Sequence, residues 1–331
     1  MSFFSGRYGL VCDNMKSATI VLANGQLVTA SATSNANLFR AIKGGTNNFG
    51  IVTSFTASLF PQDSFWGGTI AQPTTNKDAL IQYISNFTDS ATFDPNAGWI
   101  CDFTWVGGIP GIIHNIAYTD GSVSWPPPAY APVAALPKLA TTIRKAKLSS
   151  FTTEIALAQS VTNSKNNMLV TLTFVNRGQD AVDFMKDVWD LADETVKSLL
   201  TVVSLNFILT YQPLPHVLYT KGSNNGNGGN VLGLDRFNED LINLLFTLSW
   251  VLPTDNARVE TAMKALEASI KTKMNDYGVA NEFVYLNYAA AWQDPISSYG
   301  QQNVQFLKTV SQSYDPNGLF QTGVPGGFKL H

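Results

Sequence analysis

The chain has 331 residues, of which 45% are hydrophobic and only 14% are charged. This composition excludes a disordered protein, and the length suggests about two domains. The formal net charge is −3 and there is no run of Lys and Arg, so the electrostatic signature of a nucleic-acid-binding protein is absent. No apolar stretch reaches the roughly 20 residues that span a bilayer, so no contact with a membrane is expected. Two cysteines, Cys12 and Cys101, are too few for a disulfide framework.

The first 60 residues predict a small β-structure interrupted by a helix. Residues 18–31 predict a β-hairpin, because two β-branched runs flank Asn24-Gly25, a pair that suits a type I′ turn. Residues 37–43 have apolar side chains at helical spacing and precede a pair of glycines, which predicts a short helix. Residues 51–60 alternate in polarity as a strand does.

From about residue 65, strand-like runs alternate with long amphipathic segments. The strand-like runs are 67–72, 97–106, 111–119, 167–175, 202–210 and 243–251, and the helical segments are 77–88, 179–200 and 255–277. Strands of alternating polarity that are separated by helices predict an antiparallel sheet covered by helices on one face. Loops are expected at 125–128 and 223–230, where Pro, Asn and Gly cannot hold a ladder.

The C-terminal part predicts a strand over 283–288, a helix over 301–313 and a turn at 315–318. The three histidines, at positions 114, 216 and 331, are far apart in the sequence, and no metal site is predicted because none has a ligand-spaced partner. The sequence also has no Gly-x-Ser-x-Gly nucleophile elbow, no P-loop and no Gly-x-Gly-x-x-Gly after a strand.

The segment Lys43–Thr53 is the strongest candidate for ligand binding. Gly44, Gly45 and Gly50 free the backbone to approach a ligand closely, and two asparagines between them offer amide donors and acceptors. Main-chain groups of such a loop can hold a nucleotide without charged side chains. The alternative interpretation is a capped helix that leads into a strand.

Residues 38–53 resemble the flavin-domain signature of the FAD-linked oxidases of the berberine bridge enzyme-like family. That family belongs to the vanillyl-alcohol-oxidase group, whose cofactor domain is called PCMH-type. Residues 5–14 resemble the family's segment after its Gly-rich flavin loop, and residues 285–288 and 314–320 resemble its closing segment. Residues 229–234 match a stretch of its substrate domain, so the similarity follows the family's order along the whole chain.

The resemblance implies an α+β fold with three parts. Residues 1–62 would be a shortened PCMH-type lobe of the flavin domain, without the N-terminal lobe. Residues 63–282 would be a substrate domain with an antiparallel sheet covered by helices. Residues 283–331 would return to the flavin domain. Localisation is left open: the chain is expected to be soluble and its start does not resemble a signal peptide, whereas relatives are often secreted.

The resemblance also implies the cofactor FAD and a set of site residues. The expected cofactor contacts are Arg7, Tyr8, Gly9, Gly45, Asn48, Phe49, Gly50, Ile51 and Val52. Tyr285 and Tyr288 are the expected candidates for a catalytic base or proton donor, and Asn287 would orient flavin or substrate; the alternative is that the tyrosines only pack. Thr46 departs from the glycine usual in the family's loop, and its side chain is a potential obstacle to the cofactor.

Three functional interpretations remain open. The family's pyrophosphate loop and its covalent His and Cys have no counterpart here, and Cys12 lies in a different segment. The first interpretation is an FAD-linked oxidase that oxidises or cyclises a small apolar or aromatic specialised metabolite. The second is a flavin-free, redox-neutral cyclase or isomerase, and the third is a fragment that needs a homodimer or a partner chain.

Overall fold

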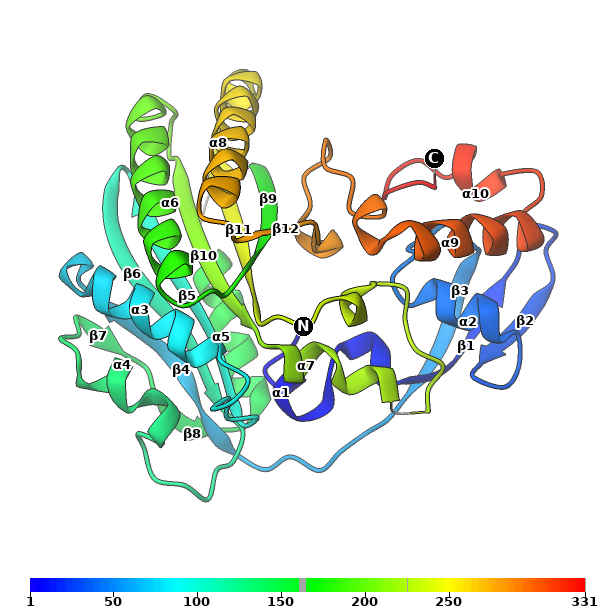
Figure 1. Ribbon diagram of the computed structural model, residues 1–331, viewed down its shortest axis with the longest axis horizontal. Helices are drawn as coiled ribbons and strands as arrows, with labels where there is room; N and C mark the ends of the chain where they lie inside the picture. Colours follow the sequence, from blue (N-terminus) through cyan, green and yellow to red (C-terminus); the bar gives the residue numbers. More distant parts are fainter. Residues whose placement is uncertain (161–164, 225, 331) are drawn as a thin grey trace. The chain divides into compact units, whose positions relative to one another are not determined.

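The computed structural model describes residues 1–160, 165–224 and 226–330 (Figure 1). The chain divides into two compact units, each built from separate stretches of sequence. Unit 1 comprises Met1–Pro61, His216–Asn238 and Phe283–His331, and unit 2 comprises Gln62–Pro215 and Glu239–Glu282. The sequence analysis assigned residues 216–238 to the substrate domain. They lie in unit 1 instead, where, for example, the Val231 N–H donates to the Lys43 carbonyl oxygen (3.2 Å).

Unit 1 contains a three-stranded antiparallel sheet in the order β2-β1-β3. Its strands are β1 (Met15–Val21), β2 (Leu27–Ser31) and β3 (Ile51–Ala57). Its described helices are α1 (Ser5–Tyr8), η1 (Val11–Asn14), α2 (Ala36–Ile42), α7 (His216–Tyr219), η4 (Lys221–Asn224), η5 (Leu234–Arg236), η7 (Leu286–Tyr288), η8 (Ser297–Tyr299), α9 (Gln301–Tyr314) and α10 (Leu319–Thr322). Helices α2 and α9 pack together, and both bury one apolar stripe, as amphipathic helices do.

The predicted hairpin is confirmed, but the predicted type I′ turn is wrong. Leu22 and Gln26 are still paired (Leu22 N to Gln26 O, 2.9 Å), which leaves a three-residue loop. The loop is closed by a bond from Gly25 N to Leu22 O (2.9 Å), and Gly25 alone among its three residues has a positive φ, of 82°. This geometry is a type I turn followed by a left-handed glycine, the usual three-residue hairpin connection.

Strand β3 is confirmed but ends at Ala57, earlier than expected. It pairs with β1, and all seven of its residues are exposed, including Ile51 (60%) and Val52 (45%). An exposed apolar edge strand is a surface that another chain can cover.

Unit 2 contains, within the described residues, a nine-stranded antiparallel sheet in the order β12-β9-β11-β10-β5-β6-β4-β7, with β8 beside β4. The strands are β4 (Phe65–Gln72), β5 (Ala97–Val106), β6 (Ile109–Tyr118), β7 (Ala140–Thr141), β8 (Arg144–Ala146), β9 (Asn166–Val175), β10 (Asn206–Leu214), β11 (Leu241–Trp250) and β12 (Ala280–Asn281). The predicted α+β class with an antiparallel sheet and covering helices is therefore confirmed.

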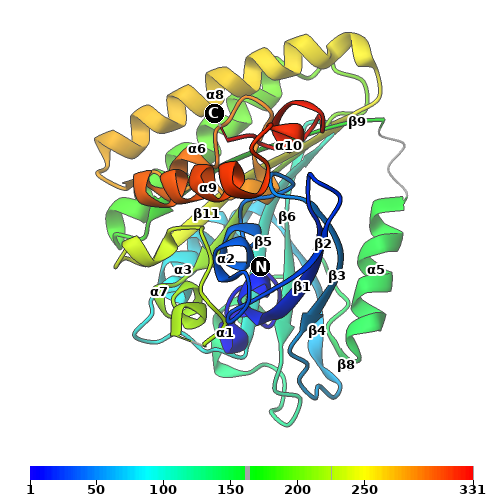
Figure 2. The same ribbon diagram turned by 90° about the vertical axis from the view of Figure 1, so that its right-hand side faces the viewer.

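Helices α3 (Lys77–Thr88), α6 (Gln179–Ser198) and α8 (Asn256–Asp276) lie over this sheet (Figure 1). Alternate residues of β5 form the core under them, and Trp105 bonds through its indole N–H to Asp193 of α6 (2.9 Å). Helix α5 (Leu148–Ser160; Figure 2) is not predicted by the sequence analysis. It packs Phe151 against Phe65 of β4 with ring centroids 5.2 Å apart. The short helices η2 (Thr74–Asn76), η3 (Pro128–Tyr130), α4 (Ala131–Ala135) and η6 (Pro253–Asp255) complete the unit as described.

Two predicted strands differ from the structure. The run 202–210 is displaced to Asn206–Leu214, because the chain leaving α6 turns back through residues 199–205, where Ser204 has a φ of 55°. The strand over 283–288 is wrong: residues 286–288 form a 3-10 turn. In the expected loop 223–230, Lys221–Asn224 form a 3-10 turn and Asn225 lies outside the described residues. Among the described residues, no helix combines the length and apolarity needed to cross a membrane.

Candidate functional site

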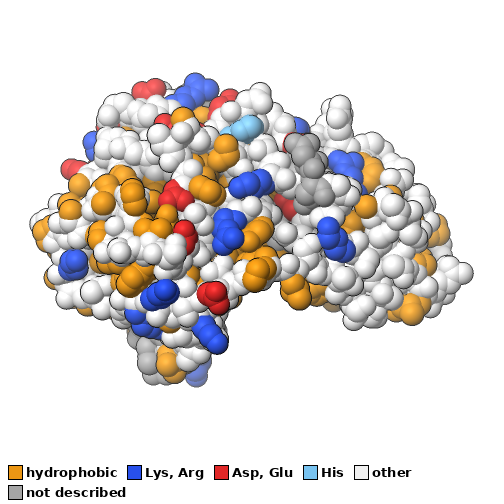
Figure 3. All heavy atoms as spheres, turned by 90° about the horizontal axis from the view of Figure 1, so that it is seen from below, with side chains coloured by type: hydrophobic (Ala, Val, Ile, Leu, Met, Phe, Trp, Pro, Cys, Tyr) orange, Lys and Arg blue, Asp and Glu red, His pale blue; other side chains and the backbone are white. Residues whose placement is uncertain are grey.

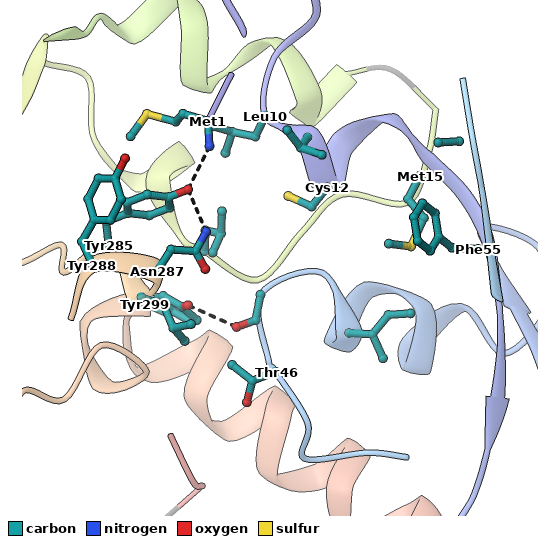
Figure 4. Close-up of a pocket in the computed structure, with 16 residues that line it drawn as sticks. Met1, Leu10, Cys12, Met15, Thr46, Phe55, Tyr285, Asn287, Tyr288 and Tyr299 are labelled. Carbon is teal, nitrogen blue, oxygen red and sulfur yellow. Dashed lines mark hydrogen bonds between the residues drawn. The ribbon is translucent and has the colours of Figure 1, made fainter. Parts of the chain in front are cut away.

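Unit 1 contains a half-open cavity of about 680 Å³. Four stretches that are distant in the sequence form its wall: residues 10–15, 42–46, 55–57 and 285–288 (Figure 4). Its lining residues are Met1, Leu10, Val11, Cys12, Met15, Ile42, Gly44, Thr46, Phe55, Ala57, Leu232, Tyr285, Leu286, Asn287, Tyr288 and Tyr299. A largely apolar cavity with a few convergent polar groups is the usual form of a small-molecule site.

The three predicted catalytic residues lie together on this wall. The Tyr288 N–H donates to the Tyr285 carbonyl oxygen (2.9 Å), which closes the 3-10 turn. With three residues per turn, side chains at i and i+3 lie one above the other, so the rings of Tyr285 and Tyr288 meet edge to face with centroids 4.8 Å apart. The Asn287 amide donates to the Tyr285 hydroxyl oxygen (2.9 Å), as does the Met1 amino group (2.8 Å; Figure 4).

Burial keeps the Tyr285 and Tyr299 hydroxyls and the Cys12 thiol protonated at neutral pH. Burial raises the pKa of the Tyr285 hydroxyl, and the hydrogen bond from Asn287 opposes this shift without cancelling it. Burial also raises the pKa of Tyr299, whose hydroxyl donates to the Gly44 carbonyl oxygen (3.1 Å). Burial, followed by the nearby Asp13 carboxylate, raises the pKa of the Cys12 thiol to about 12. Cys12 is therefore not a thiolate nucleophile at neutral pH.

A buried pair of opposite charges lies behind the cavity wall. The Asp13 carboxylate accepts bonds from the Leu10 N–H (3.1 Å) and the Asn230 amide (2.7 Å), and burial raises its pKa. The Lys43 ammonium donates to the Asn227 carbonyl oxygen, and burial lowers its pKa. These bonds join residues 10–13 and 43 to the 227–230 segment, and so hold together the stretches of chain that line the cavity.

None of the nine expected cofactor contacts lines this cavity. Gly44 and Thr46, from the same glycine-rich segment, do line it. Thr46 keeps the left-handed backbone that glycine favours, with a φ of 58°, and its hydroxyl oxygen accepts a bond from the Asn48 amide (3.0 Å). The departure from glycine at Thr46 therefore leaves the loop geometry intact and adds one side chain to the cavity.

The glycines of this segment face protein atoms. A Cβ at Gly45 would lie 2.5 Å from the Ala41 carbonyl oxygen and 2.5 Å from the Phe49 ring. Gly50, with a φ of 155°, would place a Cβ 2.7 Å from the Val21 carbonyl oxygen. Close packing accounts for both glycines, as in the capped-helix interpretation.

The other expected contacts lie in three places. Asn48 is fully buried: its amide nitrogen donates to the carbonyl oxygens of Gly45 (2.9 Å) and Phe328 (2.9 Å), whereas its Oδ1 has no hydrogen-bond partner. Ile51 and Val52 lie on the exposed strand β3. Phe49 is buried, with its ring against Gly45. The last three, Arg7, Tyr8 and Gly9, lie around α1; Arg7 and Tyr8 line a second hollow, and Gly9 has a φ of 76°.

The sequence analysis missed Tyr299, Leu232 and Phe55 as lining residues. They come from η8, the 226–233 loop and β3, and no local pattern marks them. For metals, no group of three or more His, Cys, Asp or Glu residues able to hold an ion occurs within the described part of the chain. His114 is buried in the core of unit 2, and His331 lies outside the described residues.

Comparison with known proteins finds relatives along the whole chain, although no family model matches it. The chain is 35% identical over 336 residues to an FAD-dependent monooxygenase of Emericella nidulans, covering 99% of this chain and 68% of that protein. It is 33% identical over 332 residues to an FAD-dependent monooxygenase of Aspergillus calidoustus, covering 100% of this chain and 62% of that protein. A third, from Phaeosphaeria nodorum, is 28% identical and is covered over 97% of its length. The chain thus spans about two thirds of the length of the first two relatives.

Solved structures show the same fold at lower identity. Glucooligosaccharide oxidase from Acremonium strictum, which carries a 6-S-cysteinyl, 8α-N1-histidyl FAD, aligns with a TM-score of 0.71 at 15% identity, covering 100% of this chain and 70% of that one. The berberine bridge enzyme-like protein 1 of Physcomitrella patens, as the D396N variant, aligns with a TM-score of 0.69 at 17% identity. The alignment covers 99% of this chain and 68% of that one. The fold of this chain is therefore a partial version of theirs.

Proposed function

Because the chain belongs to the FAD-linked oxidoreductases of the berberine bridge enzyme-like family, we propose that it binds FAD and oxidises, or oxidatively cyclises, a small apolar or aromatic specialised metabolite. The observation that carries this proposal is the cavity of unit 1, where Tyr285, Asn287 and Tyr288 meet apolar walls. Fungal relatives described as FAD-dependent monooxygenases support it.

The donor set of the cavity fits one part of FAD. Apolar side chains such as Met15, Phe55 and Leu232 can enclose a planar ring system, and hydroxyl and amide groups can meet its polar edge. Among the described residues, the cavity lining includes no Lys, Arg, Asp or Glu side chain. The lining thus suits the isoalloxazine ring and offers no side-chain cation to the diphosphate. When bound, FAD would supply a hydride acceptor for a substrate C–H bond.

Tyr285 is placed to hold and donate a proton. Its raised pKa keeps the phenol protonated at neutral pH, so the hydroxyl acts as an acid or a hydrogen-bond donor rather than as a ready base. The bonds from Asn287 and from the Met1 amino group to the phenol oxygen occupy its lone pairs and leave the O–H to point elsewhere. Asn287 thereby fixes the direction of the Tyr285 proton, and the Tyr288 ring restricts the rotation of the Tyr285 ring.

A redox-neutral cyclase is the second candidate function. The absence of charged side chains from the described lining favours it, because nothing there is dedicated to a diphosphate. A neutral, apolar cavity can accelerate a ring closure by holding one reactive conformer and by hydrogen-bonding charge as it develops. The Tyr285 and Tyr288 hydroxyls would supply those bonds.

An absorption spectrum of the purified protein, followed by titration with FAD, separates the two candidates. The oxidase predicts a flavin spectrum that saturates, and bleaching of the bound flavin when phenolic or polyketide-like substrates are added without oxygen. Tyr285→Phe is expected to slow bleaching by about 10²-fold with little change in FAD affinity. The matched control is Tyr314→Phe, at an exposed hydroxyl of α9. If no flavin binds at millimolar FAD, the oxidase proposal is refuted and the cyclase remains.

A further inference from the structure

A second, more open hollow of unit 1 concentrates positive charge. Its volume is about 380 Å³. It is lined by Arg7, Tyr8, Asn14, Lys16, Ser58, Leu59, Phe60, Lys221 and Asn227, and we call it the basic hollow. The lining includes three cations and no Asp or Glu, in a chain in which only 14% of residues are charged. Figure 3 shows how thinly charged side chains are spread over one face of the molecule.

A β-bulge directs Lys16 into the basic hollow. In the β1–β3 ladder Met15 faces Ala57 and Ser17 faces Thr56, so Lys16 is the extra residue of the bulge. Bulges re-aim side chains, and here Met15 lines the cavity whereas Lys16 lines the basic hollow. The Lys16 ammonium donates to Asn227 Oδ1 (2.9 Å), which holds it in place.

Lys221 enters the basic hollow from the other side, on η4. Its ammonium donates to the Gly6 carbonyl oxygen, and burial lowers its pKa. An ammonium has three donors, and one protein acceptor leaves two of them for a ligand. Within the described parts of the chain, no carboxylate lies within ion-pair distance of the Lys16 or the Lys221 ammonium. Their charges are therefore not neutralised locally.

Arg7 is the third cation of the basic hollow, and its side chain packs on a pair of stacked aromatic rings. Its guanidinium lies 4.9 Å from the centre of the Tyr8 ring, and Tyr8 stacks on Phe60 with centroids 4.0 Å apart and an interplanar angle of 20°. Stacking restricts the side chain before any ligand arrives, which reduces the entropy lost on binding. Amide groups of Asn14 and Asn227 lie in the same lining and offer neutral hydrogen bonds.

The basic hollow and the cavity share no lining residue, although the same stretches of chain contribute to both. Residues 10–16 and 55–60 supply lining residues to both, with Cys12 and Met15 in the cavity and Asn14 and Lys16 in the hollow. The Asp13 carboxylate between them is bonded to the Leu10 N–H and lines neither space. The two spaces are thus distinct sites on one stretch of chain.

We propose that the basic hollow binds a phosphate or diphosphate group. Three cations in a described lining without Asp or Glu match the charge of such a group, and ammonium and guanidinium donors form their strongest hydrogen bonds with its oxygens. A carboxylate carries one charge and would leave the other cations unmatched. The inference requires neither bound flavin nor the oxidase activity.

Binding of inorganic phosphate and inorganic diphosphate to the full chain, measured by calorimetry without flavin, tests the proposal. We expect diphosphate to bind more tightly than phosphate, and both to weaken as salt concentration rises. Lys16→Gln and Lys221→Gln are each expected to weaken diphosphate binding by roughly tenfold or more. The matched control is Lys138→Gln, which removes one exposed cation elsewhere and should leave binding unchanged.

The phosphate group has two sources, FAD itself or a separate phosphate ester, and competition distinguishes them. If FAD places its diphosphate here, inorganic diphosphate displaces FAD, and Lys16→Gln weakens FAD but not riboflavin. If a separate ester binds, diphosphate and FAD bind together. Both outcomes support an anion site. Diphosphate binding that is absent at millimolar concentration, or equal in wild type and the Lys16→Gln/Lys221→Gln double variant, would overturn the proposal, whatever the flavin result.

Discussion

Acid should weaken unit 2 through a single buried histidine, His114 of β6. The ring is fully buried, and Trp99 Nε1–H donates to its Nδ1 (3.1 Å). Because an indole nitrogen can only donate, His114 Nδ1 must accept, so the proton is on Nε2 and donates to Gln72 Oε1 (3.0 Å). The neutral ring thus satisfies both partners, and burial lowers its pKa to about 4.

The size and sign of the effect follow from the two pKa values. The unfolded chain binds a proton at His114 below pH 6.5, whereas the folded state does so only below about pH 4. The free energy of unfolding therefore decreases as the pH is lowered from 6.5 to about 4, by about 1.4 kcal/mol per pH unit, or about 3 kcal/mol in all. Above pH 6.5 this contribution is fully present.

His114→Phe isolates this contribution. At pH 7.5 the variant leaves the Trp99 N–H and the Gln72 oxygen buried without partners, which should lower the free energy of unfolding by about 3 kcal/mol. The variant cannot be protonated at this position, so the gap to wild type should close toward zero at pH 4. Urea unfolding followed by tryptophan fluorescence measures the gap at pH 7.5, 5.5 and 4.5, since six of the seven tryptophans lie in unit 2. A gap that stays constant over this range would refute the reasoning.

Three further predictions concern other parts of the chain. Burial raises the pKa of Asp102 to about 6, so its charge destabilises the folded state above that pH. In the same urea assay, Asp102→Asn should raise the free energy of unfolding by about 1–2 kcal/mol at pH 8. At pH 4 the variant should make no difference, because the wild-type carboxyl is then protonated. Gly45→Ala should lower the melting temperature of unit 1 through a clash worth more than about 2 kcal/mol, whereas Gly111→Ala, 3.4 Å from its nearest neighbour, should change stability by less than about 1 kcal/mol. We propose that a second copy of the chain covers β3; sedimentation should then show a dimer that Ile51→Ser with Val52→Ser converts to monomer, and a wild-type monomer at micromolar concentration would contradict this.

The sequence predicts elements best where one face is buried along their whole length. Strand β5 is predicted residue for residue over 97–106, because Trp99, Cys101, Phe103 and Trp105 alternate with half-buried neighbours. Helix α3 is predicted as well, at 77–88. The run 202–210 is equally apolar but contains the turn after α6, and composition does not distinguish a buried turn from a buried strand.

The candidate site was predictable in part. The resemblance placed Tyr285, Asn287 and Tyr288 together, and the structure brings them to one wall, although on a 3-10 turn rather than on a strand. Leu232 and Tyr299 could not be found, because only long-range packing brings them to the cavity. The glycines of the 43–53 segment could not be assigned from sequence, because the same residue type serves ligand approach and close packing; the structure shows close packing at Gly45 and Gly50.

The bulge at Lys16 makes this stretch of β1 respond differently to two kinds of genetic change. A point substitution at Met15 or Lys16 alters one of the two spaces and leaves the other lined as before. Deleting one residue here would instead remove the bulge, so that one side chain would stand where Met15 and Lys16 now line different spaces. Variants of this chain that keep both spaces should therefore contain no insertions or deletions between residues 10 and 17.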